Sequence, residues 1–281
     1  MLTRNPIRLD GAAVAITGGA RGIGLATAKA FAANGSRVFI GDLDADLAAA
    51  AAAEIGGHGM ALDVRSRQSF ATFLDAVDAF GTPLAVLVNN AGIMPAGRFA
   101  DEDDAITDAI LDINTRGVLI GTKLALPGML SRSSGHIVNV SSYLGKVPAA
   151  GLATYCASKH AVVGFSEALR DEIAGSGVTV SVVLPCAVRT ELTAGVKLGG
   201  VLPTVDPEDI AGAVLRSCAH RRAVVALPGW MRVYEATAAA VPDRLVAAVR
   251  GRLTRARVLR NLDTQARSGY EARVRGAAET L

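Results

Sequence analysis

Tyr155 and Lys159 stand four residues apart in the run Tyr-Cys-Ala-Ser-Lys. In a helix this spacing places both side chains on one face, so a phenol would lie beside an ammonium group. A neighbouring cation favours the phenolate, which lowers the pKa of a tyrosine below its ordinary value of about 10. The pair therefore predicts a general acid and base that works near neutral pH, although a half-buried tyrosine beside a solvated lysine has the same spacing.

A glycine-rich turn lies between the first predicted strand, residues 14–16, and the first predicted helix, residues 23–33. Glycines in such a turn let a pyrophosphate approach the free amides at the helix N-terminus. The spacing is TGxxxGxG rather than the common GxGxxG. The turn predicts a dinucleotide site or, more simply, a tight strand-to-helix junction. The dinucleotide interpretation includes Gly18, Arg21, Gly22, Ile23 and Gly24.

Asp42 follows the second predicted strand, residues 37–40, and stands 18 residues after Gly24. A carboxylate at this place can accept hydrogen bonds from an adenosine ribose and repels a 2′-phosphate, which favours NAD over NADP. Arg21 argues the other way, because its guanidinium can pair with that phosphate. The alternative for Asp42 is an aspartate that stabilises a turn or caps a helix.

Apolar runs alternate with helical patterns along most of the chain. Further helices are predicted at residues 45–55, 68–80, 105–130, 155–173 and 207–218, and further strands at residues 59–62, 85–88, 136–140, 179–184 and 223–226. Strands separated by helices imply a parallel sheet. The sequence therefore predicts an α/β fold, a Rossmann-type doubly wound parallel sheet of about seven strands, in a single domain with a C-terminal helical extension.

Taken in order, these motifs resemble those of the short-chain dehydrogenase/reductase family, in its single-domain form, over roughly residues 10–230. Residues 17–24 match the family's TGxxxGxG, and residues 89–92 match its NNAG. Asp63 and Val64 match the acidic position after the third strand, which contacts adenine. The catalytic tetrad is matched in order and spacing by Asn114, Ser142, Tyr155 and Lys159.

The resemblance implies which residues hold the cofactor. They are Gly18, Arg21, Gly22, Ile23, Gly24, Asp42, Asp63, Val64, Asn90, Ala91, Gly92, Tyr155, Lys159, Pro185, Val188 and Thr190. Of these, Val188 and Thr190 would hold the nicotinamide carboxamide. Cys186 stands where the family usually has glycine after Pro185, a departure that would change the shape of the pocket or make it sensitive to thiol reagents. The alternative is that Cys186 is simply a small apolar substitute for glycine.

The resemblance also implies the chemistry, hydride transfer between a carbinol carbon and a nicotinamide. Tyr155 would exchange the hydroxyl proton, while Lys159 would lower the pKa of Tyr155 and bind the nicotinamide ribose. Ser142, which stands 13 residues before Tyr155 and is preferred to Ser141, would hydrogen-bond the substrate oxygen. Asn114 would hold a water that links Lys159 to solvent.

The residues that follow these motifs suggest the substrate. They are mostly apolar: Ile93, Met94, Tyr143, Leu144, Val147 and the segment 192–202. We therefore expect a lipophilic secondary alcohol or ketone, of the steroid, retinoid or fatty-chain type. Two alternatives remain open, an NADPH-dependent carbonyl or 3-oxoacyl reductase and a non-catalytic dinucleotide-binding module.

The composition is that of a globular chain of 281 residues with 51% hydrophobic content. The N-terminal residues 1–10 contain no long apolar run, so a cytoplasmic location is expected. Three cysteines without a CxxC pair predict neither structural disulfides nor a metal site. By analogy with the family we expect a homodimer or homotetramer, with contacts through the predicted helices at residues 105–130 and 155–173.

The sequence divides into a dinucleotide-binding and catalytic domain, residues 1–230, and a basic extension, residues 231–281. The extension carries ten arginines against five acidic residues. Residues 241–260 predict an appended helix with Leu245, Val249 and Leu253 on one side. Such a helix can lie on an anionic membrane, form an oligomer arm or be solvated. Nucleic-acid binding is not expected, because acidic residues interrupt the basic ones.

Overall fold

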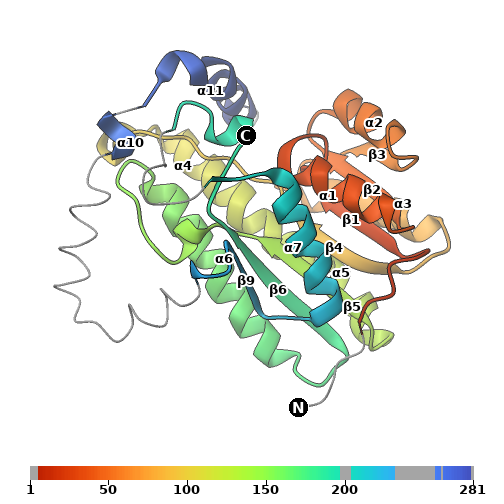
Figure 1. Ribbon diagram of the computed structural model, residues 1–281. Helices are drawn as coiled ribbons and strands as arrows, with labels where there is room; N and C mark the ends of the chain where they lie inside the picture. Colours follow the sequence, from red (N-terminus) through yellow and green to blue (C-terminus); the bar gives the residue numbers. More distant parts are fainter. Residues whose placement is uncertain (1–5, 197–203, 232–256, 261, 280–281) are drawn as a thin grey trace.

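The computed structural model describes residues 6–196, 204–231, 257–260 and 262–279. A parallel sheet of seven strands in the order β3-β2-β1-β4-β5-β6-β9 forms its centre (Figure 1), which confirms the predicted fold class. The strands are β1 (Ala13–Thr17), β2 (Arg37–Asp42), β3 (His58–Ala61), β4 (Leu84–Asn89), β5 (Gly135–Val140), β6 (Val178–Pro185) and β9 (Val224–Leu227). A separate parallel pair joins β7 (Ala187–Val188) to β8 (Thr204–Val205).

Helices cover both faces of the sheet (Figure 1). The α-helices are α1 (Gly22–Ala33), α2 (Ala45–Ala53), α3 (Arg67–Ala79), α4 (Asp104–Leu111), α5 (Gly117–Ser131), α6 (Ala153–Glu172), α7 (Pro207–His220), α10 (Arg257–Arg260) and α11 (Thr264–Glu279). Short 3₁₀ turns are η1 (Phe99–Asp101), η3 (Tyr143–Gly145) and η4 (Glu191–Thr193). Helices α1, α2 and α7 pack on one face, and α3, α5 and α6 pack on the other.

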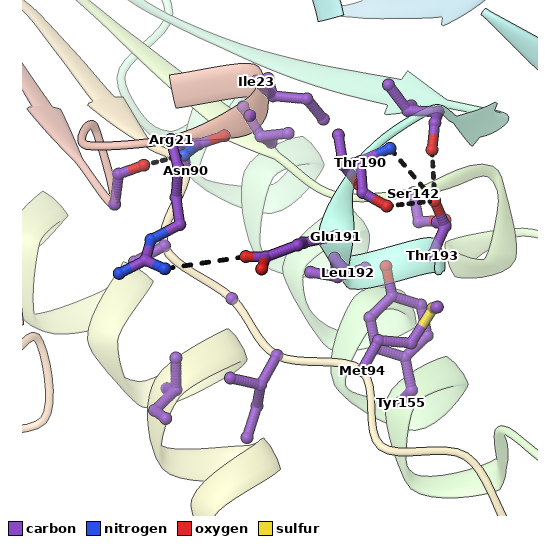
Figure 2. A pocket seen from close by; sticks show the side chains of 18 of the residues that line it. Arg21, Ile23, Asn90, Met94, Ser142, Tyr155, Thr190, Glu191, Leu192 and Thr193 are labelled. Carbon is purple, nitrogen blue, oxygen red and sulfur yellow. Dashed lines mark hydrogen bonds and ion pairs between the residues drawn. The ribbon is translucent and has the colours of Figure 1, made fainter. Parts of the chain in front are cut away.

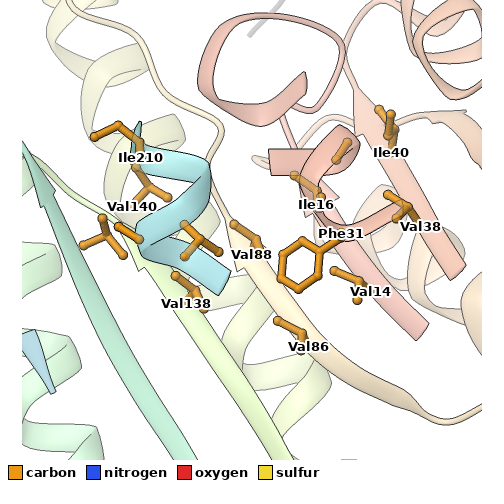
Figure 3. Close-up of a cluster of buried hydrophobic side chains, with 14 of the residues drawn as sticks. Val14, Ile16, Phe31, Val38, Ile40, Val86, Val88, Val138, Val140 and Ile210 are labelled. Carbon is orange, nitrogen blue, oxygen red and sulfur yellow. The ribbon is translucent and has the colours of Figure 1, made fainter. Parts of the chain in front are cut away.

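The core follows from strands that are apolar on both sides. Along β1, Val14 and Ile16 pack against helices α1 and α7, whereas Ala13 and Ala15 pack against the opposite layer. Figure 3 shows the first of these clusters, in which the ring of Phe31 on α1 lies among valines and isoleucines from several strands. Burial on both faces explains why these strands read as continuous apolar runs rather than alternating ones.

The strand order reverses between β1 and β4, and this is where such sheets open a crevice at their carboxyl ends. The two loops that border the crevice are hydrogen-bonded to each other. The backbone amides of Asn90 and Ala91 donate to Thr17 Oγ1, each at 3.0 Å. The Asn90 side-chain amide donates to the carbonyls of Thr17 and Gly18 at 3.0 and 2.9 Å. The fold therefore fixes the glycine-rich turn against the end of β4.

The long helix predicted at residues 105–130 is helical throughout but is built of three parts. Between α4 and α5 the chain forms a π-helical segment, η2 (Asp112–Arg116), which contains the predicted catalytic residue Asn114. Segments of this kind occur mostly at functional sites, because the wider turn redirects a side chain. Helical periodicity predicts the helix but not this local widening.

The C-terminal part of the chain lies against the catalytic part. Helix α11 packs beside α4, and α10 lies close to the start of α6 (Figure 1). Most of the helix predicted at residues 241–260 lies outside the described residues, so its proposed membrane contact stays a prediction, as does the domain boundary at residue 230. Within the described ranges, no helix is long and apolar enough to cross a membrane.

Candidate active site

A cavity of about 920 Å³ runs along the carboxyl ends of the central strands. It brings together most of the predicted site residues (Figure 2). Those that line it are Gly18, Arg21, Gly22, Ile23, Asp42, Asp63, Val64, Asn90, Ala91, Gly92, Ser142, Tyr155, Lys159, Pro185, Val188 and Thr190. Gly24 and Asn114 do not line the cavity and lie behind its wall. The volume is at the upper end of the range for small-molecule sites.

The glycine-rich turn is packed so tightly that two of its positions have no room for a Cβ atom. A Cβ atom on Gly24 would lie 2.1 Å from the carbonyl oxygen of Gly18, and one on Gly18 would lie 2.8 Å from Cα of Ala91. Gly18 also has a positive φ of 62°, which favours glycine. Helix α1 begins without a side-chain cap and without an acidic residue in its first turn. Its amides therefore suit an anionic pyrophosphate.

Two carboxylates lie at the end of the cavity where β2 and β3 finish. Asp42 accepts from the Ala20 amide through Oδ2 at 3.1 Å and from the Asp44 amide through Oδ1 at 3.3 Å. Asp63 forms an ion pair with Arg65 at 2.8 Å. Burial acts to raise the pKa of Asp63, but its hydrogen bonds and charge interaction with Arg65 outweigh burial and keep the pKa below the ordinary value. Both carboxylates are therefore held in fixed orientations.

Arg21 lies between acidic groups rather than facing the cavity alone. Its guanidinium is 3.6 Å from Asp44 and 3.7 Å from Glu191, the second of which is drawn in Figure 2. Glu191 also pairs with Arg273 of α11 at 2.9 Å. A chain of charges thus connects the glycine-rich turn with the C-terminal helix, and the acidic neighbours partly offset the charge of Arg21.

Tyr155 and Lys159 lie on one face of α6, as the spacing predicts, and both are buried. Lys159 Nζ is 5.7 Å from the centre of the Tyr155 ring and donates to the carbonyl of Val140 at 3.2 Å. The Tyr155 ring packs in a cluster with Met94 and points toward Ser142 (Figure 2). A phenol, a hydroxyl and an amine therefore meet at one end of the cavity.

The predicted direction of the Tyr155 pKa is wrong. Burial raises the pKa of the Tyr155 phenol above its ordinary value, and a hydrogen bond with Ser142 opposes this only in part. Burial also lowers the pKa of Lys159, to about 8. The spacing of the two residues indicates their proximity but not how deeply the sheet and the helices bury them.

Asn114 is held rigidly behind the cavity wall. Its amide nitrogen donates to the Ile93 carbonyl at 2.9 Å and to Ser158 Oγ at 3.1 Å, and its oxygen accepts from the Ile93 amide at 2.8 Å. A Cβ on Gly92 would lie 3.1 Å from Asn114 Oδ1 and 3.5 Å from Lys159 Nζ. The side chains of Asn114 and Lys159 therefore both lie next to Gly92. The water that Asn114 would hold stays a prediction.

The remaining predicted residues follow β6. Val188 ends β7, and Thr190 precedes η4 with its methyl group facing Gly22, since a Cβ there would be 3.4 Å away. Burial raises the pKa of the Cys186 thiol, which makes it less reactive toward thiol reagents. Ser141 Oγ donates to the Lys159 carbonyl at 2.9 Å, which leaves Ser142 as the serine nearer to Tyr155.

Sequence reasoning missed five residues of α11 that line the cavity or hold its wall. They are Arg267, Tyr270, Arg273, Val274 and Gly276. The pattern of residues 267–275 has charged and small side chains at helical spacing, which is also typical of a solvated helix. Val147, expected near the substrate, packs instead against the cluster around Tyr143. Among the described residues, no group of three or more histidine, cysteine or acidic side chains gathers as a metal site would.

Comparisons with known proteins agree with this geometry. A family model described as short chain dehydrogenase matches residues 12–199. A 2,5-dichloro-2,5-cyclohexadiene-1,4-diol dehydrogenase of Sphingobium indicum is 39% identical over 195 residues, 67% of this chain and 78% of that protein. A 2-(S)-hydroxypropyl-CoM dehydrogenase 3 of Xanthobacter autotrophicus is 36% identical over 228 residues, 74% and 89%. A crystal structure of a variant actinorhodin polyketide ketoreductase with NADPH has a TM-score of 0.72 at 30% identity, covering 79% of this chain and 97% of that chain.

Proposed function

Because the chain belongs to the short-chain dehydrogenase family and is thus an NAD(P)-dependent oxidoreductase of alcohols and ketones, we propose that it is an NAD-linked dehydrogenase of lipophilic secondary alcohols. The nicotinamide, when bound, takes up or supplies the hydride. The protein's own residues then have to bind the dinucleotide, orient the carbinol and move one proton. The grouping of Tyr155, Ser142 and Lys159 at one end of the cavity supports this division of labour.

We assign the proton transfer to Tyr155. In oxidation its oxygen takes the hydroxyl proton, and in reduction its phenol returns the proton to the substrate oxygen. Ser142 is the hydrogen-bonding partner of Tyr155 and would hold the same substrate oxygen. Lys159 lines the cavity beside both and would bind the nicotinamide ribose, with Asn114 fixing the loop at residue 93 behind it.

The proposal of NAD rather than NADP rests on the position of the Asp42 carboxylate at the end of β2. It is fixed by two backbone amides, and the carboxylate of Asp44 follows directly. A ribose can donate its hydroxyl protons to Asp42, whereas a 2′-phosphate there would meet two negative charges. Arg21 offers less to such a phosphate, because it pairs with Asp44 and Glu191.

Fluorescence titration of NADH and NADPH tests this choice. We expect wild type to bind NADH more tightly, and Asp42→Ala to lose about 10- to 100-fold in NADH affinity, the value of one or two hydrogen bonds to a charged group. Asp42→Asn keeps an acceptor for the Ala20 amide but removes the charge, so it should bind NADPH more tightly than wild type does. Asp46→Ala, an exposed change on α2, is the control and should change neither affinity.

Preference of the wild type for NADPH would contradict the proposal and favour the alternative, an NADPH-dependent carbonyl or 3-oxoacyl reductase. Arg21 is the observation that supports this alternative, since it lines the cavity and its side chain is 41% exposed. The similar polyketide ketoreductase, whose structure contains NADPH, points the same way. Asp42→Ala would then leave NADPH binding unchanged or improve it.

The proposed substrate is lipophilic because the part of the cavity beyond Tyr155 is lined mainly by apolar side chains. These are Ile93, Met94, Tyr143, Leu144, Leu192 and Val274. Such a lining favours a ring or chain of carbon atoms around the reacting carbinol. Rates for secondary alcohols of increasing carbon number test the idea, and a rate that does not rise with apolar size would contradict it.

We also propose a cytoplasmic homodimer or homotetramer. Along helices α4 and α5, Leu111, Leu119 and Leu130 are 40%, 38% and 36% exposed. Leucines left exposed along these helices favour a contact between copies of the chain. Light scattering coupled to gel filtration should give a multiple of 28.8 kDa, and Leu119→Glu should lower it. A monomeric wild type would refute the assembly.

A further inference from the structure

Arg267 of α11 is fully buried and bonds to two segments of the cavity wall, the loop at Met94 and the stretch from Leu192 to Ala194. Its guanidinium donates to the carbonyl of Met94 at 2.7 Å, to that of Leu192 at 3.2 Å and to that of Ala194 at 2.9 Å. Its Nε atom pairs with Glu271 at 3.2 Å. A buried charge is costly unless all its donors are hydrogen-bonded. These bonds therefore indicate that α11 packs in one defined position against the catalytic domain.

The backbone at Gly195 approaches α11 so closely that only glycine leaves room for Arg267. Gly195 has a positive φ of 68°, and a Cβ there would lie 2.5 Å from the Asp263 carbonyl and 2.8 Å from Cγ of Arg267. The Gly195 carbonyl accepts from the Asp263 amide at 3.0 Å. Asp263 in turn accepts from the Ala266 amide at 3.0 Å, which caps the start of α11. The helix is therefore fixed at its first turn as well as at Arg267.

Tyr270 lies one turn further along α11 and lines the cavity together with Tyr155. The Arg267 guanidinium lies 4.9 Å from the centre of its ring. The Met94 amide donates to the Tyr270 hydroxyl at 2.6 Å, so the oxygen of this phenol is the acceptor in that bond. Within the described part of the chain no group accepts the proton of Tyr270. That proton is therefore available to an oxygen atom inside the cavity.

The phenol also stays protonated at working pH. Burial raises the pKa of Tyr270 to about 12, although its bond from Met94 and the charge of Arg267 act in the opposite direction. Tyr270 can then donate a hydrogen bond to an oxygen atom in the cavity.

We propose that Tyr270 determines specificity by donating a hydrogen bond to a second oxygen of the substrate, with Arg267 as the residue that positions it. This inference rests on the proposed function and narrows the substrate class to diols and hydroxyketones whose second oxygen is separated from the reacting carbinol by an apolar ring or chain. Tyr155 and Ser142 hold the reacting oxygen, and Tyr270 holds the other one. A monoalcohol of the same carbon skeleton leaves the Tyr270 proton without a partner, which costs affinity.

The test compares the cyclohexane-1,2-, 1,3- and 1,4-diols with cyclohexanol, using the full chain and NAD⁺. In wild type, kcat/KM for at least one diol should exceed that for cyclohexanol by about three- to tenfold, the value of one neutral hydrogen bond. Tyr270→Phe keeps the ring and removes only the hydroxyl. It should abolish this advantage, mainly by raising KM for the diol, while kcat for cyclohexanol and the affinity for NADH stay within about twofold.

Arg267→Lys tests the positioning role, because lysine keeps the charge but loses the planar set of donors. It should also reduce the advantage of the diol although Tyr270 is still present. Arg275→Lys is the matched control, the same change at an exposed position of the same helix, and should have no effect. Melting temperatures of all variants separate loss of the preference from loss of the fold.

The inference would be overturned if Tyr270→Phe lowered kcat/KM equally for the diol and for cyclohexanol, or if it lowered neither. Weaker NADH binding in this variant would also overturn it, because the donor would then face the dinucleotide. Failure to oxidise any alcohol with NAD⁺ or NADP⁺ would contradict the proposed function instead. In that case the role of Tyr270 is still tested by calorimetry, which measures the affinity of the diols for the NADH complexes of wild type and Tyr270→Phe. Equal affinities would exclude the proposed hydrogen bond.

Discussion

Replacing Gly24 by alanine tests whether the tight turn after β1 holds the dinucleotide. The added Cβ would lie 2.1 Å from the Gly18 carbonyl oxygen, 2.7 Å from Asn90 Nδ2 and 2.8 Å from Cα of Gly19. Two of these three atoms belong to the backbone, so no side-chain rotation relieves the overlap. The turn would have to move by about 1 Å before the closest contact reaches an ordinary distance. Such a shift displaces the amides that are proposed to bind a pyrophosphate.

Two effects set the magnitude of the change in stability. Overpacking costs about 1–3 kcal/mol, and alanine gains up to about 1 kcal/mol over glycine inside a helix. The net loss of up to about 2 kcal/mol corresponds to a fall in melting temperature of up to about 4 °C for a chain of this size. Affinity should suffer more, because each lost hydrogen bond to a charged phosphate is worth about 1.5–3 kcal/mol. We therefore expect NADH to bind at least tenfold more weakly.

The assay is a fluorescence titration with NADH, together with a thermal melt. Gly212→Ala on α7 is the matched control, since its Cβ would meet only the mobile end of Arg216 at 3.1 Å. That variant should bind NADH as wild type does and melt at the same or a slightly higher temperature. If Gly24→Ala bound NADH within twofold of wild type and melted unchanged, the turn could not be the phosphate site described above.

Two further predictions concern groups that titrate. Tyr155→Phe should lower kcat by about 10²- to 10⁴-fold with little change in NADH affinity, and a variant that keeps more than a tenth of the wild-type rate in steady-state kinetics would exclude Tyr155 as the acid and base. His136 is buried beside Thr179 and Ser217, and burial together with the charges of Arg221 and Arg170 lowers its pKa to about 3. As pH decreases from about 6.5 toward 3, His136 takes up a proton in the unfolded chain before it does in the folded one, so the free energy of unfolding should fall by at most about 1.4 kcal/mol per pH unit. Denaturant unfolding of His136→Gln at several pH values should show a weaker dependence of this free energy on pH. An equal dependence in wild type and variant would refute the assignment.

The parts of the site that the sequence predicts are those carried by short motifs at strand ends. The glycine-rich turn, Asp42 and the run that contains Tyr155 are contiguous patterns, and the alternation of strands and helices places them all at one edge of a parallel sheet. Local spacing is sufficient here, because each motif is positioned by the strand or helix that it borders. The same reasoning predicts all seven strands of the main sheet, with each end within one residue except the end of β2, which lies two residues further on.

Other features depend on information that local patterns do not contain. The contact between Met94 and Tyr270 joins residues 176 positions apart, and no motif in either segment points to the other. The pKa of Tyr155 depends on burial by several elements at once, which outweighs the neighbour that the spacing identifies. The π-helical segment around Asn114 differs from an α-helix by a single residue per turn, below what helical periodicity resolves.

The late position of α11 in the chain has a consequence during synthesis. Tyr155 and Lys159 leave the ribosome 108 or more residues before Arg267, a delay of about 5–20 seconds at the usual rates of elongation. In that interval the sheet and the phosphate turn can form, while the carbonyls of Met94, Leu192 and Ala194 still face water. The proposed dinucleotide site would therefore be complete before the proposed contact of Tyr270 with a substrate. Binding of the cofactor would precede selection among alcohols as the polypeptide grows.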